Sequence, residues 1–454
     1  MVGCMPEPTP CDLLITGGTV LDLDRADGRI DATVAVTEGI VVAVDPAPDA
    51  AERWAPQRTI AADGAYVAAG FVDGHIHLSA VLGAAQPYTA ATGPSLFGGA
   101  GSTADIGRAL HQFLQMPVPA DLVEAAVAPV LAALAIGGTT AVVDAGSAGI
   151  DGIVAAARRV GVRVAAGPSL HDVLLGDTGE VVPVADAGSV LAAAEDWLMR
   201  QQVTPGDLFE PVLTVTEPTF CSDGLLDGLA GLVARTGVAV TFHSHETVES
   251  VADRDHAHGR PAIDRLADHG LLGPRCTLMH AGSVSDRDIE VIAATRTCVN
   301  VNPLGNGMLG FGAAAERAIT RYLEAGVRLV LGSDYTPSMI ATGFDLVRAA
   351  LIVTREAGGA DDTLTLEQAL RMAANGTVTA GAVADLVVVD RTGPHHVGVD
   401  HPVPGLALRA RPGDVRTVIV GGRIVVDAGT LVTADPGDLR SAAEAALGLV
   451  RSHS

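Results

Sequence analysis

The sequence contains no lysine, because all 29 of its basic residues are arginine. This absence excludes every mechanism that needs a lysine nucleophile, a Schiff base or a carboxylated lysine that bridges two metal ions. Positive charge is scarce in general: 53 acidic residues outnumber the basic ones and give a formal net charge of −24. Since nucleic-acid phosphates require a basic surface, we expect no nucleic-acid partner.

Cysteine is scarce as well. The 5 cysteines are scattered along the chain and form no CxxC pair, which argues against a disulfide framework and against a thiolate zinc site. The first ten residues have neither the basic nor the apolar segment of a secretory signal. We therefore expect a cytoplasmic protein.

One uncharged stretch, residues 125–143, is long enough to suggest a membrane span. Pro129 and the Gly137-Gly138 pair interrupt it. We predict instead a buried helix, a glycine turn and a strand that begins near Thr139. No membrane partner is expected.

Short apolar runs with glycine turns fill both ends of the chain. Residues 13–21 surround Gly17-Gly18, and residues 415–426 surround Gly421-Gly422. This pattern is typical of β-hairpins. We predict that residues 1–67 and 381–454 pack together as one small β-sandwich domain.

The middle of the chain, residues 68–380, alternates strands and helices. Three helix ends share a glycine, Gly161, Gly237 or Gly326, before a β-branched strand start. The candidate strands are Gly70–His77, Thr139–Ala145, Val162–Ala166, Leu208–Val215, Ala239–His245, Cys276–His280, Cys298–Asn302 and Val327–Asp334. Eight such units predict an α/β fold, a (β/α)₈ TIM barrel. An open doubly wound sheet is the alternative, but its GxGxxG fingerprint is missing.

Four polar clusters stand at the carboxyl ends of these strands, where a barrel of this kind builds its active site. The first contains His75 and His77, which point the same way because strand side chains alternate. The second is His243-Ser244-His245-Glu246. Either histidine of this second cluster is a candidate ligand, and its glutamate is a candidate proton carrier.

The third and fourth clusters end later strands with His280 and Asp334. An aspartate at the end of an apolar strand is costly to bury unless it is paired or binds a metal. Each cluster alone is compatible with structural hydrogen bonding, but four together indicate one site. Imidazole and carboxylate ligands favour zinc or ferrous iron over calcium or magnesium. The other histidines considered are expected to be solvated (His256, His258, His269) or structural (His395, His396, His401).

These motifs resemble the amidohydrolase superfamily, and most closely its branch of cytosine, guanine and S-adenosylhomocysteine deaminases and triazine hydrolases. The resemblance runs over nearly the whole chain. The segments that carry it include GFVDGHIH at 70–77, GTT at 138–140, HSHET at 243–247, GSD at 332–334 and ADLVVVD at 384–390.

The resemblance implies one divalent metal ion, zinc first and ferrous iron as the alternative. Its implied ligands are His75, His77, His243 and Asp334. It also implies that His280 contacts the hydroxide or the substrate, that Glu246 carries protons, and that His245 is not a ligand. The lack of lysine agrees, because the two-metal relatives bridge their ions through a carboxylated lysine. Thr216 or Glu217 stands where the family often has a histidine, so no named substrate is carried over.

The implied activity is hydrolysis of a non-peptide C–N bond, first of all deamination of an amino-substituted heterocycle by a metal-bound hydroxide. A cyclic amide or imidazolone hydrolase that opens a ring is one alternative, and a triazine-type hydrolase that expels chloride or an alkylamine is another. A catalytically silent metal-binding scaffold is the non-enzyme alternative. Glu246 and Asp334 argue against this scaffold, because a structural metal site is usually filled by four protein ligands and has no additional acidic residue beside it. We expect a small-molecule substrate and a homodimer or larger homo-oligomer.

Overall fold

A closed barrel of eight parallel strands forms the larger part of the molecule. The computed structural model describes residues 7–85, 103–115, 117–201, 203–204, 206–245, 257–309, 313–334, 339–359 and 363–453. The barrel strands are β6 (Phe71–Ile76), β7 (Thr139–Asp144), β8 (Arg163–Ala166), β12 (Phe209–Val215), β13 (Ala239–Ser244), β14 (Cys276–His280), β15 (Cys298–Val301) and β16 (Leu329–Leu331). They are hydrogen-bonded in this order. The barrel closes where the Asp334 amide donates to the His75 carbonyl over 2.7 Å and where Ile76 bridges Asp334.

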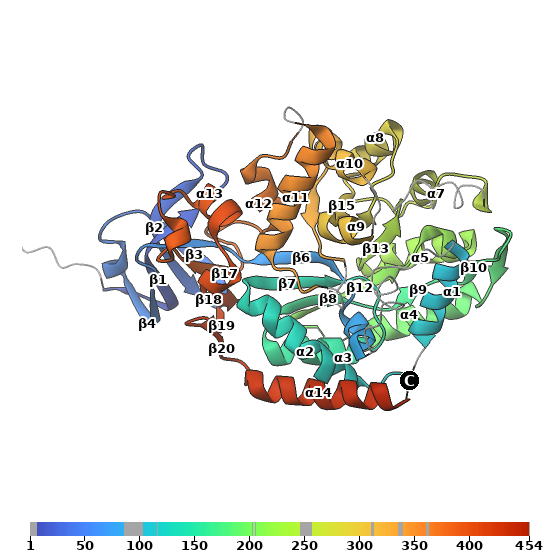
Figure 1. Cartoon of the computed structure of the whole chain (residues 1–454), viewed down its shortest axis with the longest axis horizontal. Coiled ribbons are helices and arrows are strands. Elements are labelled where there is room, and N and C mark those ends of the chain that lie inside the picture. The colour runs from blue at the N-terminus through green and yellow to red at the C-terminus, as the bar shows by residue number, and fades with distance from the viewer. Residues whose placement is uncertain are drawn as a thin grey trace, which may run out of the picture.

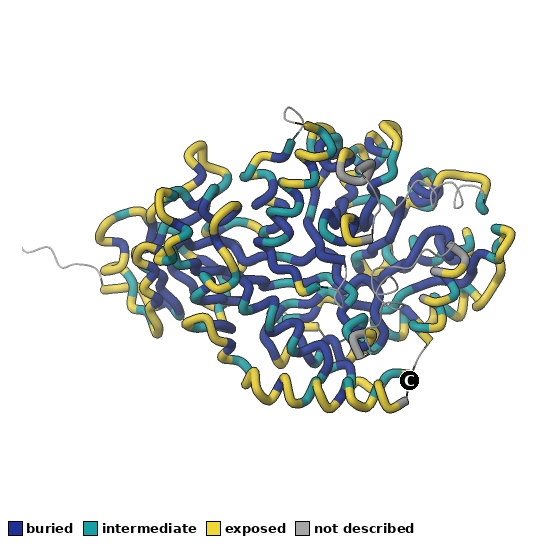
Figure 2. Tube along the Cα trace, viewed as in Figure 1, coloured by how far each residue is buried: buried dark blue, intermediate teal, exposed yellow. Residues whose placement is uncertain are grey.

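All eight predicted barrel strands are confirmed, although β16 is shorter than expected. A two-stranded hairpin of β10 (Val173–Leu175) and β11 (Val181–Pro183) follows the short strand β9 (Ser169–Leu170), which pairs with β12. Helices surround the strands and bury them from solvent (Figures 1 and 2).

The helices of the described part lie around the barrel, and the last of them ends the described chain. Their bounds are α1 (Thr103–Gln115), α2 (Ala120–Ile136), α3 (Ile150–Val160), α4 (Ala187–Arg200), α5 (Asp223–Thr236), α7 (Ala262–Asp268), α8 (Asp286–Thr295), α9 (Pro303–Leu309), α10 (Ala313–Glu324), α11 (Gly343–Gly358), α12 (Leu366–Ala373), α13 (Pro402–Pro404) and α14 (Pro436–His453). Gly161 and Gly237 end α3 and α5 in the left-handed conformation, with φ of 92° and 73°. The predicted glycine joins between helix and strand are therefore confirmed at these two positions.

A second sheet combines strands from both ends of the chain, and Figure 1 shows its blue and red strands side by side. Its strands are β1 (Thr9–Leu21), β2 (Arg29–Thr37), β3 (Ile40–Asp45), β4 (Trp54–Ala61), β5 (Ala65–Ala69), β17 (Leu386–Asp390), β18 (Val415–Val420), β19 (Arg423–Asp427) and β20 (Thr430–Leu431). The two ends join where β5 pairs antiparallel with β17. The predicted domain boundaries, 1–67 with 381–454 and 68–380, stay a prediction.

The Gly17-Gly18 pair does not form the turn that the sequence suggests. β1 continues through it, and its register against β2 shifts between Ile15 and Gly18, which is a β-bulge. Gly17 has a φ of 74°, and a Cβ atom there would lie 2.2 Å from the Asp63 carboxylate. The positive φ therefore favours glycine at this bulge, while the Asp63 side chain could move away from a Cβ atom.

The uncharged stretch forms the buried helix, the turn and the strand that were predicted, as α2 and β7. No single helix in the described part is long and apolar enough to cross a membrane. One bent pair, Gly107–Gln115 with Ala120–Ile136, meets the criteria of length and composition, but its two helices meet at 115°. Nine residues of α2 are buried inside the protein.

A buried ion pair fastens the terminal sheet to the barrel. Asp385, only 2% exposed, accepts hydrogen bonds from Arg163 on β8 (2.8 Å), from the Asn375 side chain (2.9 Å) and from the Gly421 amide (2.6 Å). Loss of the arginine leaves a buried carboxylate without its cation, which is strongly destabilising.

We therefore predict that Arg163→Met lowers the free energy of unfolding by about 3 kcal/mol in a urea titration. The matched control is Arg58→Met, which breaks the exposed pair between Arg58 and Asp427 and is expected to cost less than about 1 kcal/mol. Equal small losses in the two variants would contradict the bracing role of Asp385.

Candidate metal centre and active site

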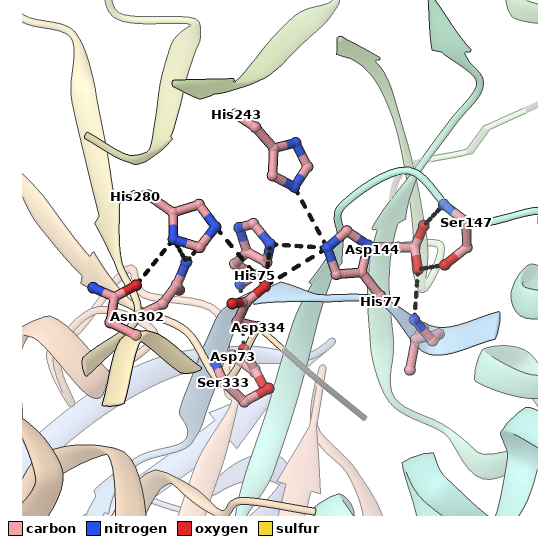
Figure 3. Close-up of polar contacts among 12 residues, drawn as sticks. Asp73, His75, His77, Asp144, Ser147, His243, His280, Asn302, Ser333 and Asp334 are labelled. Carbon is pink, nitrogen blue, oxygen red and sulfur yellow. Dashed lines mark hydrogen bonds and ion pairs between the residues drawn. The ribbon is translucent and has the colours of Figure 1, made fainter. Parts of the chain in front are cut away.

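Four side chains, two within strands and two that directly follow or lie just beyond a strand, converge at the carboxyl end of the barrel (Figure 3). His75 and His77 come from β6 and the residue after it, His243 from β13, and Asp334 from the segment after β16. We call these four residues the histidine–aspartate cluster. Each was predicted from the sequence as a ligand, and the structure brings all four together.

The distances within the cluster suit a shared cation. Nε2 of His77 lies 3.3 Å from Nε2 of His75 and 3.4 Å from Nε2 of His243. Oδ1 of Asp334 lies 3.2 Å from Nε2 of His75 and 3.7 Å from Nε2 of His77. A zinc ion bound tetrahedrally at about 2.0–2.1 Å separates neighbouring ligand atoms by about 3.4 Å. These four separations therefore match those between neighbouring ligands of a tetrahedral metal site.

Burial makes the Asp334 carboxylate the strongest sign that a cation belongs here. Asp334 is 4% exposed, and its Oδ2 has no hydrogen-bond partner among the described residues. Burial by itself would raise the pKa of Asp334, but His280, His75 and His77 hold this pKa below its usual range. A buried anion with a bare oxygen is costly unless a cation satisfies it.

Two of the imidazoles, His75 and His243, are kept neutral, as metal ligands must be. Burial lowers the pKa of His75 to about 3. Burial, together with the neighbouring histidines, lowers the pKa of His243 well below its usual value. The rings therefore present lone pairs to the centre at neutral pH.

His280 lies beside the cluster, with its Nε2 3.8 Å from Oδ1 of Asp334. Its Nδ1 is 3.1 Å from Oδ1 of Asn306 and 3.3 Å from Nδ2 of Asn302. If Nδ1 donates to Asn306, Nε2 is left as an acceptor that faces the site. His280 and Asp334 have φ of 66° and 71°. These left-handed conformations, rare outside glycine, fit a site held by its surroundings.

A layer of buried carboxylates holds the ligand-bearing segments. Asp73 accepts from the Ser333 amide (2.9 Å), from the Ser333 hydroxyl (2.5 Å) and from the His75 amide (3.2 Å), and burial raises its pKa to about 6. Asp144 at the end of β7 accepts from the Leu78 amide at 3.0 Å and lies near His77 (Figure 3). These bonds fix the start and the end of the barrel against each other. Ser333 and Leu78 are distant along the chain from these carboxylates, so a local sequence pattern does not reveal these contacts.

The predictions for six other histidines can be judged. His245 has a φ of 55°, and its Nδ1 lies 2.5 Å from the Ser244 hydroxyl, outside the convergent set. The solvated state expected for His258 and His269 is wrong. His258 is half-buried against the Thr219 carbonyl at 2.9 Å, and the His269 side chain is 12% exposed beside Asp227. Neighbouring barrel loops and α5 reach these rings, which a local pattern does not reveal.

Two predicted positions, Glu246 and His256, lie outside the described residues. His395 and His396 pair with Asp414, and His401 lies 2.7 Å from the Asp27 carbonyl, so these three rings have structural partners as expected.

Residues 66–425, most of the chain, match the amidohydrolase family. The chain belongs to this family. A 5-methylthioadenosine/S-adenosylhomocysteine deaminase of Syntrophobacter fumaroxidans is 29% identical over 440 residues, which cover 93% of this chain and 94% of that one. A 5′-deoxyadenosine deaminase of Methanopyrus kandleri is 28% identical over 236 residues, which cover 49% and 54% of the two chains.

Solved structures support the same amidohydrolase fold. An adenosine deaminase of Xanthomonas campestris with bound zinc superposes with a TM-score of 0.81 at 22% identity and covers 98% of this chain and 100% of that one. An atrazine chlorohydrolase of Arthrobacter aurescens complexed with zinc gives a TM-score of 0.80 at 22% identity, with 96% and 100% covered.

The low pKa of His75 predicts that the stability of the metal-free protein depends on pH. The pKa of His75 is about 3 when folded and about 6.5 when unfolded, so the unfolded chain alone takes up this proton as the pH falls below 6.5. Stability should therefore fall by about 1.4 kcal/mol per pH unit for this residue. Urea titrations between pH 6 and 4.5, after a chelator has removed the metal, measure this loss of stability. His75→Asn should show a shallower slope, and an unchanged slope would mean that His75 is already charged in the fold.

Proposed function

We propose that the protein is a metal-dependent hydrolase that deaminates an adenosine-type nucleoside. The observation that carries the proposal is the histidine–aspartate cluster, in which four pairs of ligand atoms lie 3.2–3.7 Å apart beside a buried carboxylate. The named activities of the relatives support the substrate class, since the Syntrophobacter and Methanopyrus proteins are deaminases of adenosine derivatives.

The cluster is proposed to hold one divalent ion, zinc first and ferrous iron second. Three imidazoles and one carboxylate suit either metal, and two of the structural relatives carry zinc. When bound, the ion would supply a water molecule whose pKa is lowered toward about 7.

The protein's own residues would then move the protons. His280 and Asp334 lie together and would orient the attacking water and take its proton. Glu246, three residues after the ligand His243, would donate a proton to the ring nitrogen next to the carbon under attack. The proton taken from the water would then pass to the departing amine, so that ammonia leaves, and the Glu246 carboxylate would regain a proton from the hydroxyl that becomes the carbonyl oxygen.

Two wider properties belong to the same proposal. We place the enzyme in the cytoplasm, which fits the four described cysteines, all of them free and buried. The net charge of −24 speaks against a nucleic-acid partner. A homodimer or larger homo-oligomer stays a prediction from the sequence.

The activity is tested by incubating the purified enzyme with adenosine and measuring ammonia release together with the mass of the product. We expect ammonia in proportion to product, loss of activity on chelation, and recovery with zinc. No ammonia from adenosine, together with ring opening of a cyclic amide or loss of chloride from a chlorotriazine in parallel assays, would favour the alternative hydrolases.

The proton-carrying role predicts that Glu246→Gln keeps its metal but loses about 10²–10⁴-fold in kcat. The matched control is Glu324→Gln, at the exposed end of α10, which should turn over at the parent rate. Metal content by mass spectrometry and steady-state kinetics measure the two properties. Parent-like turnover in Glu246→Gln would contradict the role.

A further inference from the structure

A second pair of histidines, His111 and His171, lies in the barrel mouth and has no part in the mechanism above. His111 Nδ1 and His171 Nε2 are 2.7 Å apart. His171 is 9% exposed, close to the 7% of His243. Sequence reasoning missed the pair, because its members are 60 residues apart.

The register of the barrel places His171 on the same rim as the histidine–aspartate cluster. β9 sets Leu170 beside Val215 of β12, and β12 sets Val215 beside Phe242 of β13. These three side chains belong to the main hydrophobic core. His171 directly follows β9, and the ligand His243 follows Phe242 on β13, so the alternation of side chains predicts that both turn to the opposite, inward face. Two strand spacings of about 4.8 Å put their backbones about 10 Å apart.

Thr216 occupies the rim position between His171 and His243. Thr216 follows Val215 on β12, and its hydroxyl is 2.7 Å from the Ser169 hydroxyl. Thr216 is therefore engaged with its neighbour.

Helix α1 places His111 beside His171. Gly107 lies against the Phe220 ring so closely that a Cβ atom would be 2.7 Å from Cζ. His111 follows Gly107 by four residues and so lies on the same face of the helix. Figure 1 shows α1 next to β9 and β10, in agreement with the hydrogen bond between the two rings.

The pair offers a defined set of hydrogen-bonding groups. Burial and the nearby His111 lower the pKa of His171, which keeps its ring neutral at physiological pH. One ring of a neutral pair donates to the other, so the outer nitrogens, His171 Nδ1 and His111 Nε2, are left as one donor and one acceptor in either tautomer. Neither outer nitrogen has a hydrogen-bond partner among the described residues. A sugar diol, whose hydroxyls each donate and accept, complements this arrangement.

We infer that His171, positioned by His111, is a specificity-determining residue that binds the sugar hydroxyls of the substrate about two strand spacings from the metal cluster. This inference rests on the proposed nucleoside deaminase function and names the part of the protein that selects the nucleoside over other amino heterocycles.

The test compares adenosine with 2′,3′-dideoxyadenosine, which lacks the diol, in the parent and in His171→Ala. We expect His171→Ala to lower kcat/KM for adenosine at least about 10-fold, mostly through KM, and to change kcat/KM for the dideoxy substrate little. His111→Ala, at a half-buried position, should shift adenosine in the same direction and carries the test if His171→Ala does not fold. His269→Ala, a histidine paired with Asp227 outside the rim, is the matched control and should leave the ratio of the two substrates at the parent value.

The outcomes separate the two claims. Equal losses for the two substrates, or no loss, in a metal-loaded variant of an active parent would overturn the inference and leave the deaminase function standing. A metal-loaded parent that turns over neither nucleoside would overturn the nucleoside deaminase function and the inference with it.

Discussion

The Asp334 carboxylate is the group on which the site depends. It is buried at the closing point of the barrel, and its backbone amide makes the hydrogen bond to His75 that joins the last strand to the first. Its side chain lies 3.2 Å from His75, whose own protonation is suppressed by burial. An anion in this position is unfavourable alone and favourable with a divalent cation, so closing the barrel and binding a metal are two results of one arrangement.

The surrounding structure serves to keep this arrangement rigid. Asp73 accepts hydrogen bonds from Ser333, which is 260 positions away in the sequence, and so holds the adjacent Asp334 in place. Gly305 allows α9 to approach Asp334, because a Cβ atom at position 305 would lie 2.5 Å from Cβ of Asp334. At the other end of the barrel, the ion pair of Arg163 and Asp385 attaches the terminal sheet. Rigid support of this kind keeps ligand atoms at metal-binding distances.

Much of the architecture could be predicted from the sequence, because it follows from local patterns. Apolar runs that end in His75, His77, His243 or Asp334 predict one site, since the carboxyl ends of parallel strands meet on one face of a barrel. The bulge at Gly17-Gly18 could not be distinguished from a turn, because glycine permits either.

Residues that act across the sequence escaped prediction. The contact between Asp73 and Ser333 spans 260 positions, and the pair of His111 and His171 joins a helix to a strand exit. The left-handed backbone at His280, which turns the side chain from the alternating pattern into the site, is decided by its surroundings and not by the residue type.

The central claim is that one metal ion is held by three imidazoles and one carboxylate. X-ray absorption at the metal edge of the purified enzyme tests it most directly. The account predicts one ion per chain, a first shell of nitrogen and oxygen at about 2.0–2.1 Å, and outer-shell scattering from three imidazole rings. Sulfur ligands, or a second metal at about 3.5–4 Å, would contradict it.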